Sequence, residues 1–228
     1  VRLRNVVPDE GAYGQGVATT RVEYAPDLFL DEALEFITTH RERPFFLYFA
    51  TTLPHANNEA GARGMEIPDY GAYAREEWPE PEKGFAAMVT RLDSDVGKIV
   101  EAIDRLGLGP DTLIVFTSDN GPHQEGGHAA DFFDSNGPLR GTKRDLYEGG
   151  IRVPTLMRWT GRAPAGAQAE QLGYFPDFFA TFADIARLAE PPLRDGISLL
   201  PVLTRPDQAG GRSDGLYWEF HENRIQVQ

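Results

Sequence analysis

The sequence predicts an α/β fold with a mostly parallel central sheet that helices cover on both faces. Two short, continuously apolar runs, at 45–50 and 113–116, are typical of strands buried on both sides, as in parallel sheets. Between them, residues 83–107 carry apolar side chains at alternating steps of four and three, the spacing of a long amphipathic helix. A strand, a helix and a second strand in this order form a βαβ unit, which is right-handed by default.

The other elements follow from local signals along the chain. A first helix is predicted over 26–40, where Pro26 suits the first turn and apolar residues fall on one face. The spacing over 83–107 also fits a coiled coil, but between two strands it is more typical of a crossover helix that covers a sheet. After the second strand, at 112–117, we expect a third strand over 151–159, a helix over about 176–188 and a further strand over 216–220.

Composition excludes several classes of function. The 228 residues carry a formal net charge of −13, which disfavours nucleic-acid binding and requires any anion site to be locally cationic. There are no cysteines, so disulfides, cysteine-based zinc sites and thiol catalysis are excluded for this chain. No run of ~18 apolar residues occurs, so no membrane span is expected. The chain shows no signal-peptide pattern, and both of its ends are expected to be cut.

Two polar clusters follow the first two predicted strands, at the strand ends where ligands bind in open α/β sheets. His55 follows the first strand, and Asp119 and Asn120 follow the second. One anionic and one neutral oxygen ligand suit a hard cation such as Ca²⁺ or Mg²⁺. A turn is the simpler interpretation from spacing alone, because Asn-Gly is a strong turn signal. His55 fits a proton donor near neutral pH, or a structural histidine.

Five further residues are candidates for the site or its support. Lys143 lies in a basic, glycine-containing stretch that could bind an anion or form a solvated turn. His123 and His128 flank a glycine-rich loop and could face substrate or solvent. Glu148 and Arg152 bracket a Gly-Gly pair, where a structural ion pair is the preferred interpretation over catalysis.

Taken together, four segments resemble the sulfatase (arylsulfatase) family of the alkaline-phosphatase-like superfamily. The matching pieces, in the family's order and spacing, are PFFLY at 44–48 leading to Pro54 and His55, TSDNG at 117–121, GTKRDLYEGGIRVP at 141–154 and DGISLLP at 195–201. The third piece is highly specific, whereas an isolated Asp-Asn-Gly would be weak. The resemblance covers roughly residues 26–222 and implies an alkaline-phosphatase-like fold, here incomplete.

The resemblance also implies a role for each matching residue. Asp119 and Asn120 would complete a calcium site, with Mg²⁺ the less expected ion. Lys143 would bind the sulfate and offset charge on the ester oxygen, and His55 would donate a proton to, or hydrogen-bond, the leaving oxygen. Superfamily phosphatases commonly have His at the position of Asn120, so Asn favours a single-calcium sulfatase. The implied substrates are aryl or carbohydrate sulfates.

The departures from the family pattern concern the nucleophile. The family forms a formylglycine from Cys or Ser in a Cys/Ser-x-Pro-x-Arg motif, with the help of a formylglycine-generating enzyme, and this chain has no such motif. The paired aspartates of the metal site are also not identifiable. We expect both features to precede residue 1, so 1–212 would be a partial catalytic domain and 213–228 the start of a truncated C-terminal subdomain. This chain alone is expected to be inactive.

Two other functions stay open: hydrolysis of phosphate or phosphonate esters by a member of the same superfamily, and a non-catalytic module that binds carbohydrates or anions. Sugar contacts are expected from the loops at 57–82 and 123–134, and from 218–221. The resemblance implies a periplasmic or secreted protein. Finally, Lys143 reaches the site by a short path only if the third strand runs antiparallel to the first two.

Overall fold

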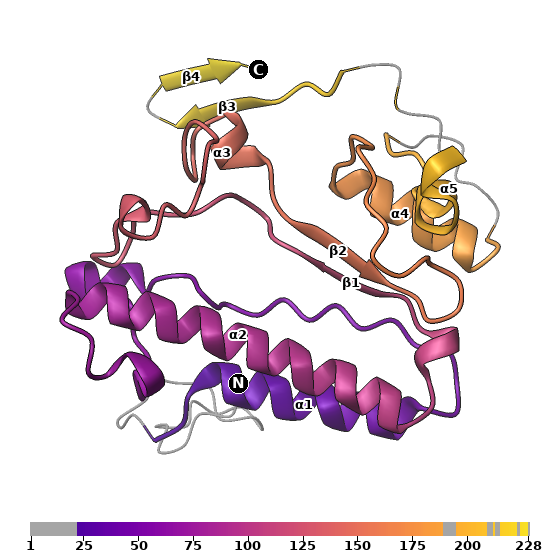
Figure 1. Ribbon diagram of the computed structural model, residues 1–228, viewed down its shortest axis with the longest axis horizontal. Helices are drawn as coiled ribbons and strands as arrows, with labels where there is room; N and C mark the ends of the chain where they lie inside the picture. Colours follow the sequence, from indigo (N-terminus) through magenta and orange to yellow (C-terminus); the bar gives the residue numbers. More distant parts are fainter. Residues whose placement is uncertain (1–21, 189–194, 209–211, 213–214, 223, 228) are drawn as a thin grey trace, which may run out of the picture. The chain divides into compact units, whose positions relative to one another are not determined.

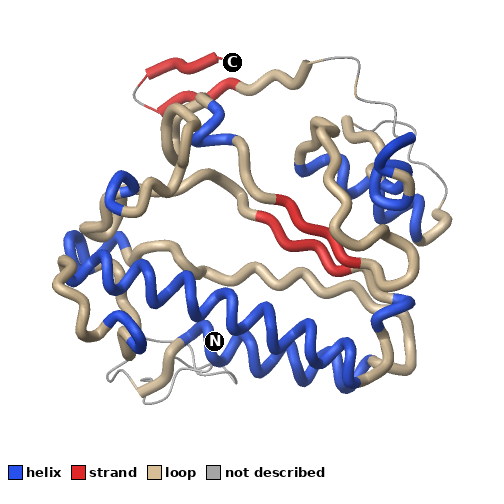
Figure 2. Tube along the Cα trace, in the orientation of Figure 1, coloured by secondary structure: helices blue, strands red, loops and turns tan. Residues whose placement is uncertain are grey.

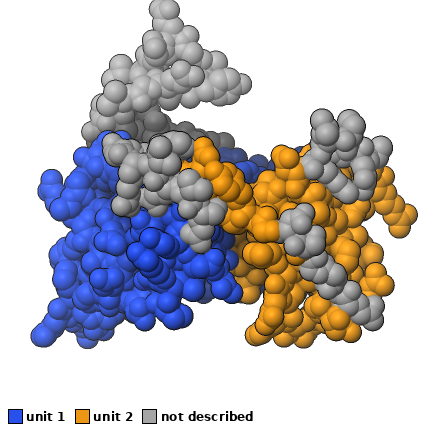
Figure 3. Space-filling model, turned by 90° about the horizontal axis from the view of Figure 1, so that it is seen from above, with its two compact units in different colours: residues 1–108, 119–153 blue, residues 109–118, 154–228 orange. Residues whose placement is uncertain are grey.

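The computed structural model of the chain describes residues 22–188, 195–208, 212, 215–222 and 224–227. These residues cluster into two compact units, coloured separately in Figure 3. The first unit draws on 1–108 and 119–153, and the second on 109–118 and 154–228. The boundary expected after residue 212 lies beside residues outside the described part and stays a prediction. None of the described helices is long and apolar enough to cross a membrane.

The first unit is built on two long helices that pack against each other, α1 (Ala25–His40) and α2 (Glu80–Arg105), seen in Figure 1. Both predicted helices are therefore confirmed. In α1 the buried residues recur at helical spacing, from Leu30 through Ala33 to Ile37. The guanidinium of Arg91 on α2 bonds to Asp27 on α1 and to the buried carboxylate of Asp95, so an ion-pair network accompanies the apolar contact.

The buried face of α2 differs from the predicted apolar stripe. Val89 belongs to the apolar residues whose spacing over 83–107 predicts a buried stripe, but it is 41% exposed, whereas Glu82 and Asp95 are buried. The reason is that both carboxylates have partners: Asp95 pairs with Arg91, and Glu82 accepts hydrogen bonds from the loop around residue 128. Apolar periodicity alone does not detect a buried polar side chain that is fully paired.

The first predicted strand, 45–50, is wrong as a strand buried on both faces. The segment is not assigned as a strand, and its side chains alternate, with Phe46 67% and Tyr48 75% exposed. A strand requires a neighbour for its backbone N–H and C=O groups, and the two strand pairs seen among the described residues do not include 45–50. The βαβ unit and the central parallel sheet are thus not seen in the described part of the chain, although it contains both helices and sheets.

The described strands form two antiparallel pairs, drawn in red in Figure 2. In the second unit, β1 (Ile114–Thr117) pairs with β2 (Thr155–Arg158), and Thr117 lies opposite Thr155. The antiparallel direction expected for the third strand is thus confirmed against β1. Its start is corrected, because residues 148–151 form the helical turn α3 (Glu148–Ile151). The predicted strand 216–220 is shorter and later, as β3 (Glu219–Glu222), which pairs with β4 (Arg224–Val227).

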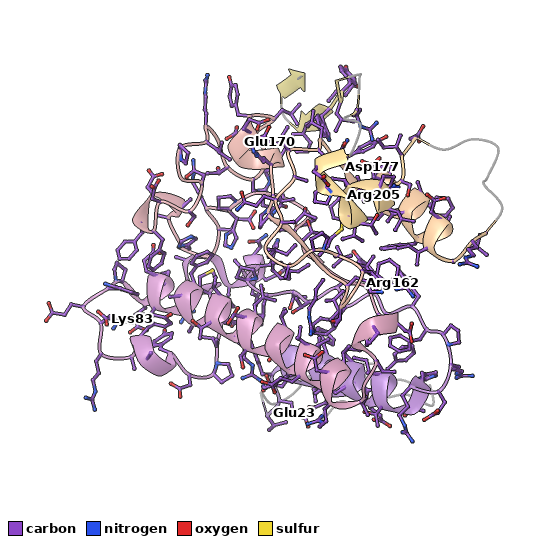
Figure 4. All side chains as sticks on the ribbon, turned by 45° about the vertical axis from the view of Figure 1, so that its right-hand side comes forward. Glu23, Lys83, Arg162, Glu170, Asp177 and Arg205 are labelled. Atoms are coloured by element: carbon purple, nitrogen blue, oxygen red, sulfur yellow. The ribbon has the colours of Figure 1, made fainter. Side chains whose placement is uncertain are left out.

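Two short helices of the second unit are joined through one buried carboxylate, Asp177, labelled in Figure 4. Asp177 lies in the first turn of α4 (Phe175–Ile185) and is 0% exposed. Its oxygens accept hydrogen bonds from the backbone N–H groups of Tyr174 and Ile197 and from the guanidinium of Arg212. This places the segment that leads to α5 (Leu200–Thr204) against α4. Within the described residues the 3₁₀ turns are η1 (Asn58–Arg63), η2 (Gly71–Tyr73), η3 (Gly109–Asp111), η4 (Ala130–Phe132) and η5 (Pro206–Gln208).

Replacing Asp177 by Ala should lower the free energy of unfolding by about 3 kcal/mol, because it leaves the buried guanidinium of Arg212 without its carboxylate. Chemical denaturation would measure the change. Asp184→Ala is the matched control, because Asp184 is exposed on the same helix and should change stability by less than about 0.5 kcal/mol. Equal effects of the two substitutions would contradict the role assigned to Asp177.

Candidate active site

His55 lies in the polar loop after residues 45–50, and its ring is oriented by the backbone. Its backbone N–H donates to Thr52 O at 2.7 Å, and its Nδ1 lies 2.7 Å from Ala56 O. A carbonyl oxygen can only accept, so Nδ1 carries the proton. The other ring nitrogen, Nε2, is thereby left to face the side chains of neighbouring loops.

The loop that carries Lys143 is held to the segment after β1 by close backbone contact. Gly121 N donates to Gly150 O at 2.9 Å, and Lys143 N donates to Pro122 O at 2.8 Å. A Cβ on Gly121 would lie 1.9 Å from the carbonyl oxygen of Gly149, so no larger residue fits. The two segments approach this closely because Gly121 has no Cβ, whereas a Cβ on Gly149 would overlap the carbonyl oxygen of Gly141 within the loop that carries Lys143.

Four side chains from three loops meet at the resulting site. The ammonium of Lys143 lies 2.8 Å from Nε2 of His55 and donates to Oε2 of Glu125 at 3.0 Å. The other oxygen of Glu125 pairs with Nη1 of Arg144 at 2.7 Å, and His55 Nε2 lies 3.5 Å from Glu125 Oε2. Sequence reasoning placed His55 and Lys143 together, but it missed Glu125 and gave Arg144 no role.

Glu125 remains ionised despite its position. Burial acts to raise the pKa of its carboxyl, but the hydrogen bond from Lys143 and the charges of Lys143, Arg144 and His55 outweigh burial and hold that pKa below its usual value. The cluster therefore combines cationic donors with one fixed anion. The sequence signal for Glu125 was weak, since a glutamate in a glycine-rich loop is ordinarily solvated.

His123 connects the loops that carry His55 and Glu125. Its side chain is buried; Nε2 donates to Pro54 O at 3.0 Å, and Nδ1 accepts from the backbone N–H of Glu125 at 3.1 Å. This pattern requires the neutral ring, and burial lowers the pKa of His123 accordingly. The sequence left two alternatives open for His123, a ring that faces substrate or one that faces solvent. In the structure both ring nitrogens bond to backbone, while substrate contact stays a prediction.

His128 is also buried and has a carboxylate partner. Its Nδ1 lies 2.5 Å from Oε2 of Glu82, whose other oxygen accepts from the backbone N–H of Ala129. The ring stacks on Phe85 with centroids 3.8 Å apart. The loop 121–129 is thus joined to α2. The sequence allowed His128 to face substrate or solvent; its ring is buried, and contact with substrate stays a prediction.

Asp119 and Asn120 follow β1 directly, as the sequence predicted. Asp119 is exposed, and Asn120 Nδ2 donates to Gly121 O at 3.1 Å. Ca²⁺ takes about six to eight oxygen ligands, so these two residues fit the cation in ligand type and supply part of its coordination shell. Within the described residues, no group of three or more His, Cys, Asp or Glu side chains is arranged to hold a metal.

Glu148 and Arg152 form an ion pair with each other. Arg152 Nη1 lies 3.3 Å from Glu148 Oε2, one helical turn away, and both side chains are more than half exposed. An exposed pair of this kind contributes little to stability.

Comparison with known proteins assigns the family. A family model described as Sulfatase matches residues 6–188. The chain belongs to the sulfatase family. It is similar to N-acetylgalactosamine-6-sulfatase of Canis lupus familiaris, 37% identical over 186 residues that cover 77% of this chain and 32% of that relative. It is also similar to the steryl-sulfatase of Mus musculus, 35% identical over 76% of this chain and 26% of that relative. The chain thus spans a third or less of these curated sulfatases.

Solved structures support the alkaline-phosphatase-like fold of the sulfatase family. The structure of Ps i-CgsB in complex with k-i-k-neocarrahexaose aligns with a TM-score of 0.68 and 31% identity, covering 83% of this chain and 40% of that one. The PsFucS1 sulfatase from Pseudoalteromonas sp. aligns with a TM-score of 0.61 and 24% identity, covering 86% of this chain and 37% of that one, and shows the fold alone.

Replacing Gly121 by Ala should destabilise the protein by about 1–3 kcal/mol, because the new Cβ overlaps the backbone of Gly149. Urea unfolding would measure this. Gly97→Ala is the control: Gly97 lies inside α2 with open space at its Cβ position, so Ala should stabilise by about 0.5–1 kcal/mol. A neutral Gly121→Ala would contradict the close contact.

Acid should weaken the protein through His123. Because its folded pKa lies below the ordinary value of 6.5, the unfolded chain binds a proton that the folded protein does not, and stability is lost as pH falls below 6.5. The His123→Gln variant should not lose stability through this group at low pH. The free energy of unfolding of wild type minus that of His123→Gln should be constant above pH 6.5 and decrease below it. A difference that is independent of pH, from urea titrations at several pH values, would refute this account.

Proposed function

We propose that the protein to which this chain belongs hydrolyses sulfate esters. The observation that carries the proposal is the approach of Lys143 Nζ to His55 Nε2, at 2.8 Å, between two loops far apart in the sequence. Sulfate-ester cleavage develops negative charge on the leaving oxygen, and a cation beside a proton donor stabilises that charge. Membership of the sulfatase family supports the same reaction.

The two side chains would act on different atoms of the ester. The ammonium of Lys143 would bind a sulfate oxygen and offset the charge that builds on the group. His55, whose Nδ1–H donates to Ala56 O, would act in its doubly protonated form: Nε2, which accepts from Lys143 in the structure, would first take up a proton from solvent and then deliver it to the leaving oxygen. The backbone bond fixes the ring in the orientation that this step needs, so His55 does not have to reorient during the reaction.

Asp119 and Asn120 would hold Ca²⁺ through their side-chain oxygens. When bound, the ion would withdraw charge from the sulfate oxygens. The proposed nucleophile is the formylglycine of the family, and no residue of this chain supplies it, because the chain lacks both Cys and a Ser-x-Pro-x-Arg sequence. We therefore expect the 228-residue chain alone to be inactive and a formylglycine-generating enzyme to act on the complete protein.

Carbohydrate sulfates are the proposed substrates. The name N-acetylgalactosamine-6-sulfatase, carried by relatives 37% identical to this chain, supports a sulfated sugar, and family resemblance supports an exported protein. The two loops expected to contact sugar meet in an aromatic cluster: Trp78 packs edge-on against Phe132 and Phe133. Phe132 is 42% exposed, so this cluster presents an aromatic surface of the kind that packs against ligand rings.

The test is sulfate release from an aryl sulfate by the full-length protein, coexpressed with a formylglycine-generating enzyme. Lys143→Ala and His55→Ala should each lower kcat by about 10²- to 10³-fold, and a calcium chelator or Asp119→Ala should abolish turnover. Lys98→Ala is the matched control, since Lys98 is half-exposed on α2 and should leave turnover unchanged.

Turnover of an aryl phosphate under the same conditions separates the alternative hydrolase of the superfamily from a sulfatase. Faster phosphate release than sulfate release would reject the proposal. Absence of both activities, with correctly formed formylglycine and with sulfated sugars also inert, would favour the non-catalytic binding module.

A further inference from the structure

Glu125 already supplies an anionic oxygen to the cation that would bind the sulfate. An ammonium has three N–H donors, and the described residues engage two of those on Lys143, through His55 Nε2 at 2.8 Å and Glu125 Oε2 at 3.0 Å. A ligand oxygen that binds Lys143 must therefore lie beside the carboxylate of Glu125. Every negative charge on the ligand interacts with that carboxylate as well as with the ammonium.

The carboxylate is not free to move aside. Arg144 Nη1 forms an ion pair with Oε1 of Glu125 at 2.7 Å. The backbone N–H of Glu125 donates to the buried ring of His123. The Glu125 side chain is only 10% exposed. Arg144 itself adopts a φ of 77°, a conformation that costs a non-glycine residue energy. The side chain of Arg144 pairs with Glu125 despite this cost in backbone energy.

We infer that Glu125 is a specificity-determining residue that makes the site favour monoanionic sulfate esters over dianionic phosphate esters. Coulomb energy is linear in the charge of the ligand, so a fixed carboxylate repels a dianion about twice as strongly as a monoanion of the same shape. A sulfate monoester carries one negative charge and an ionised phosphate monoester carries two. The substrate assignment in this inference rests on the proposed function, whereas the discrimination by charge does not.

The test is the affinity of two non-hydrolysable ligands of matched shape, phenylmethanesulfonate and benzylphosphonate. Titration calorimetry on the metal-loaded full-length protein, at a pH where the phosphonate is a dianion, gives both dissociation constants. Glu125→Gln keeps the size of the side chain and removes its charge. It should tighten benzylphosphonate about tenfold and phenylmethanesulfonate about threefold, the ratio expected when the logarithm of the effect doubles with charge.

Glu125→Asp is the control, because it keeps the negative charge and should preserve the preference of the wild type for the sulfonate. Gln124→Glu is an independent second variant: Gln124 is exposed, its side chain donates to Thr142 beside Lys143, and an added charge there should weaken the phosphonate more than the sulfonate. Thermal unfolding checks that each variant is folded. If Glu125→Gln does not fold, the affinities measured for Gln124→Glu decide the test.

Equal tightening of both ligands in Glu125→Gln, weakened binding of either ligand, or the same gain in Glu125→Asp would overturn the inference. The readout is binding and needs no turnover, so the two proposals fail separately. If charge discrimination is found without hydrolysis of any sulfate ester, the proposed function is rejected and the role of Glu125 stands. If a sulfate ester is hydrolysed but Glu125→Gln leaves the ratio of the two dissociation constants unchanged, the proposed function stands and the role of Glu125 is rejected.

Discussion

The site depends on one close backbone contact, between Gly121 and the Gly149-Gly150 pair. The hydrogen bond from Gly121 N to Gly150 O joins the segment after β1 to the basic loop, and Lys143 N bonds to the residue next to Gly121. Asp119 and Asn120 immediately precede Gly121. The same contact therefore holds the loop with the proposed metal ligands next to the loop with the proposed sulfate-binding lysine. The glycines are required by space, since a Cβ on Gly121 or Gly149 would lie about 2 Å from a carbonyl oxygen.

Three histidines of this unit, His55, His123 and His128, differ in exposure and in their partners. His55 is half-exposed, with one ring nitrogen bound to backbone and the other facing Lys143. The buried rings instead connect segments of the chain: His123 joins the loop of His55 to Glu125, and His128 joins the same glycine-rich loop to Glu82 on α2. Glu125 is bonded through both its backbone and its side chain. A mobile carboxylate would turn toward solvent, whereas this fixed carboxylate can affect ligand binding.

The sequence predicted correctly those elements that depend on local patterns of residues. Both long helices were found because apolar periodicity and a proline in the first turn are local signals. The strand at 45–50 was wrong because strand pairing is non-local, and none of the described residues supplies its neighbour. In the site, His55 and Lys143 were recognisable from family motifs. Glu125 was not, because its importance comes from two consecutive cations, Lys143 and Arg144, that lie in another loop and meet Glu125 only in the fold.

An acidic chain that binds an anion must do so by local charge, and the local balance is finer than the sequence suggests. The net charge of −13 opposes an anionic ligand at long range, so attraction must come from Lys143, Arg144 and the proposed cation. Glu125 neutralises part of that attraction at a distance of 3.0 Å from the binding ammonium. Affinity then depends on how many charges the ligand places beside Glu125, and not on general attraction to a positive surface. A site of this kind can bind a weakly charged ester group while disfavouring more strongly charged ions, which a purely cationic pocket would bind most tightly.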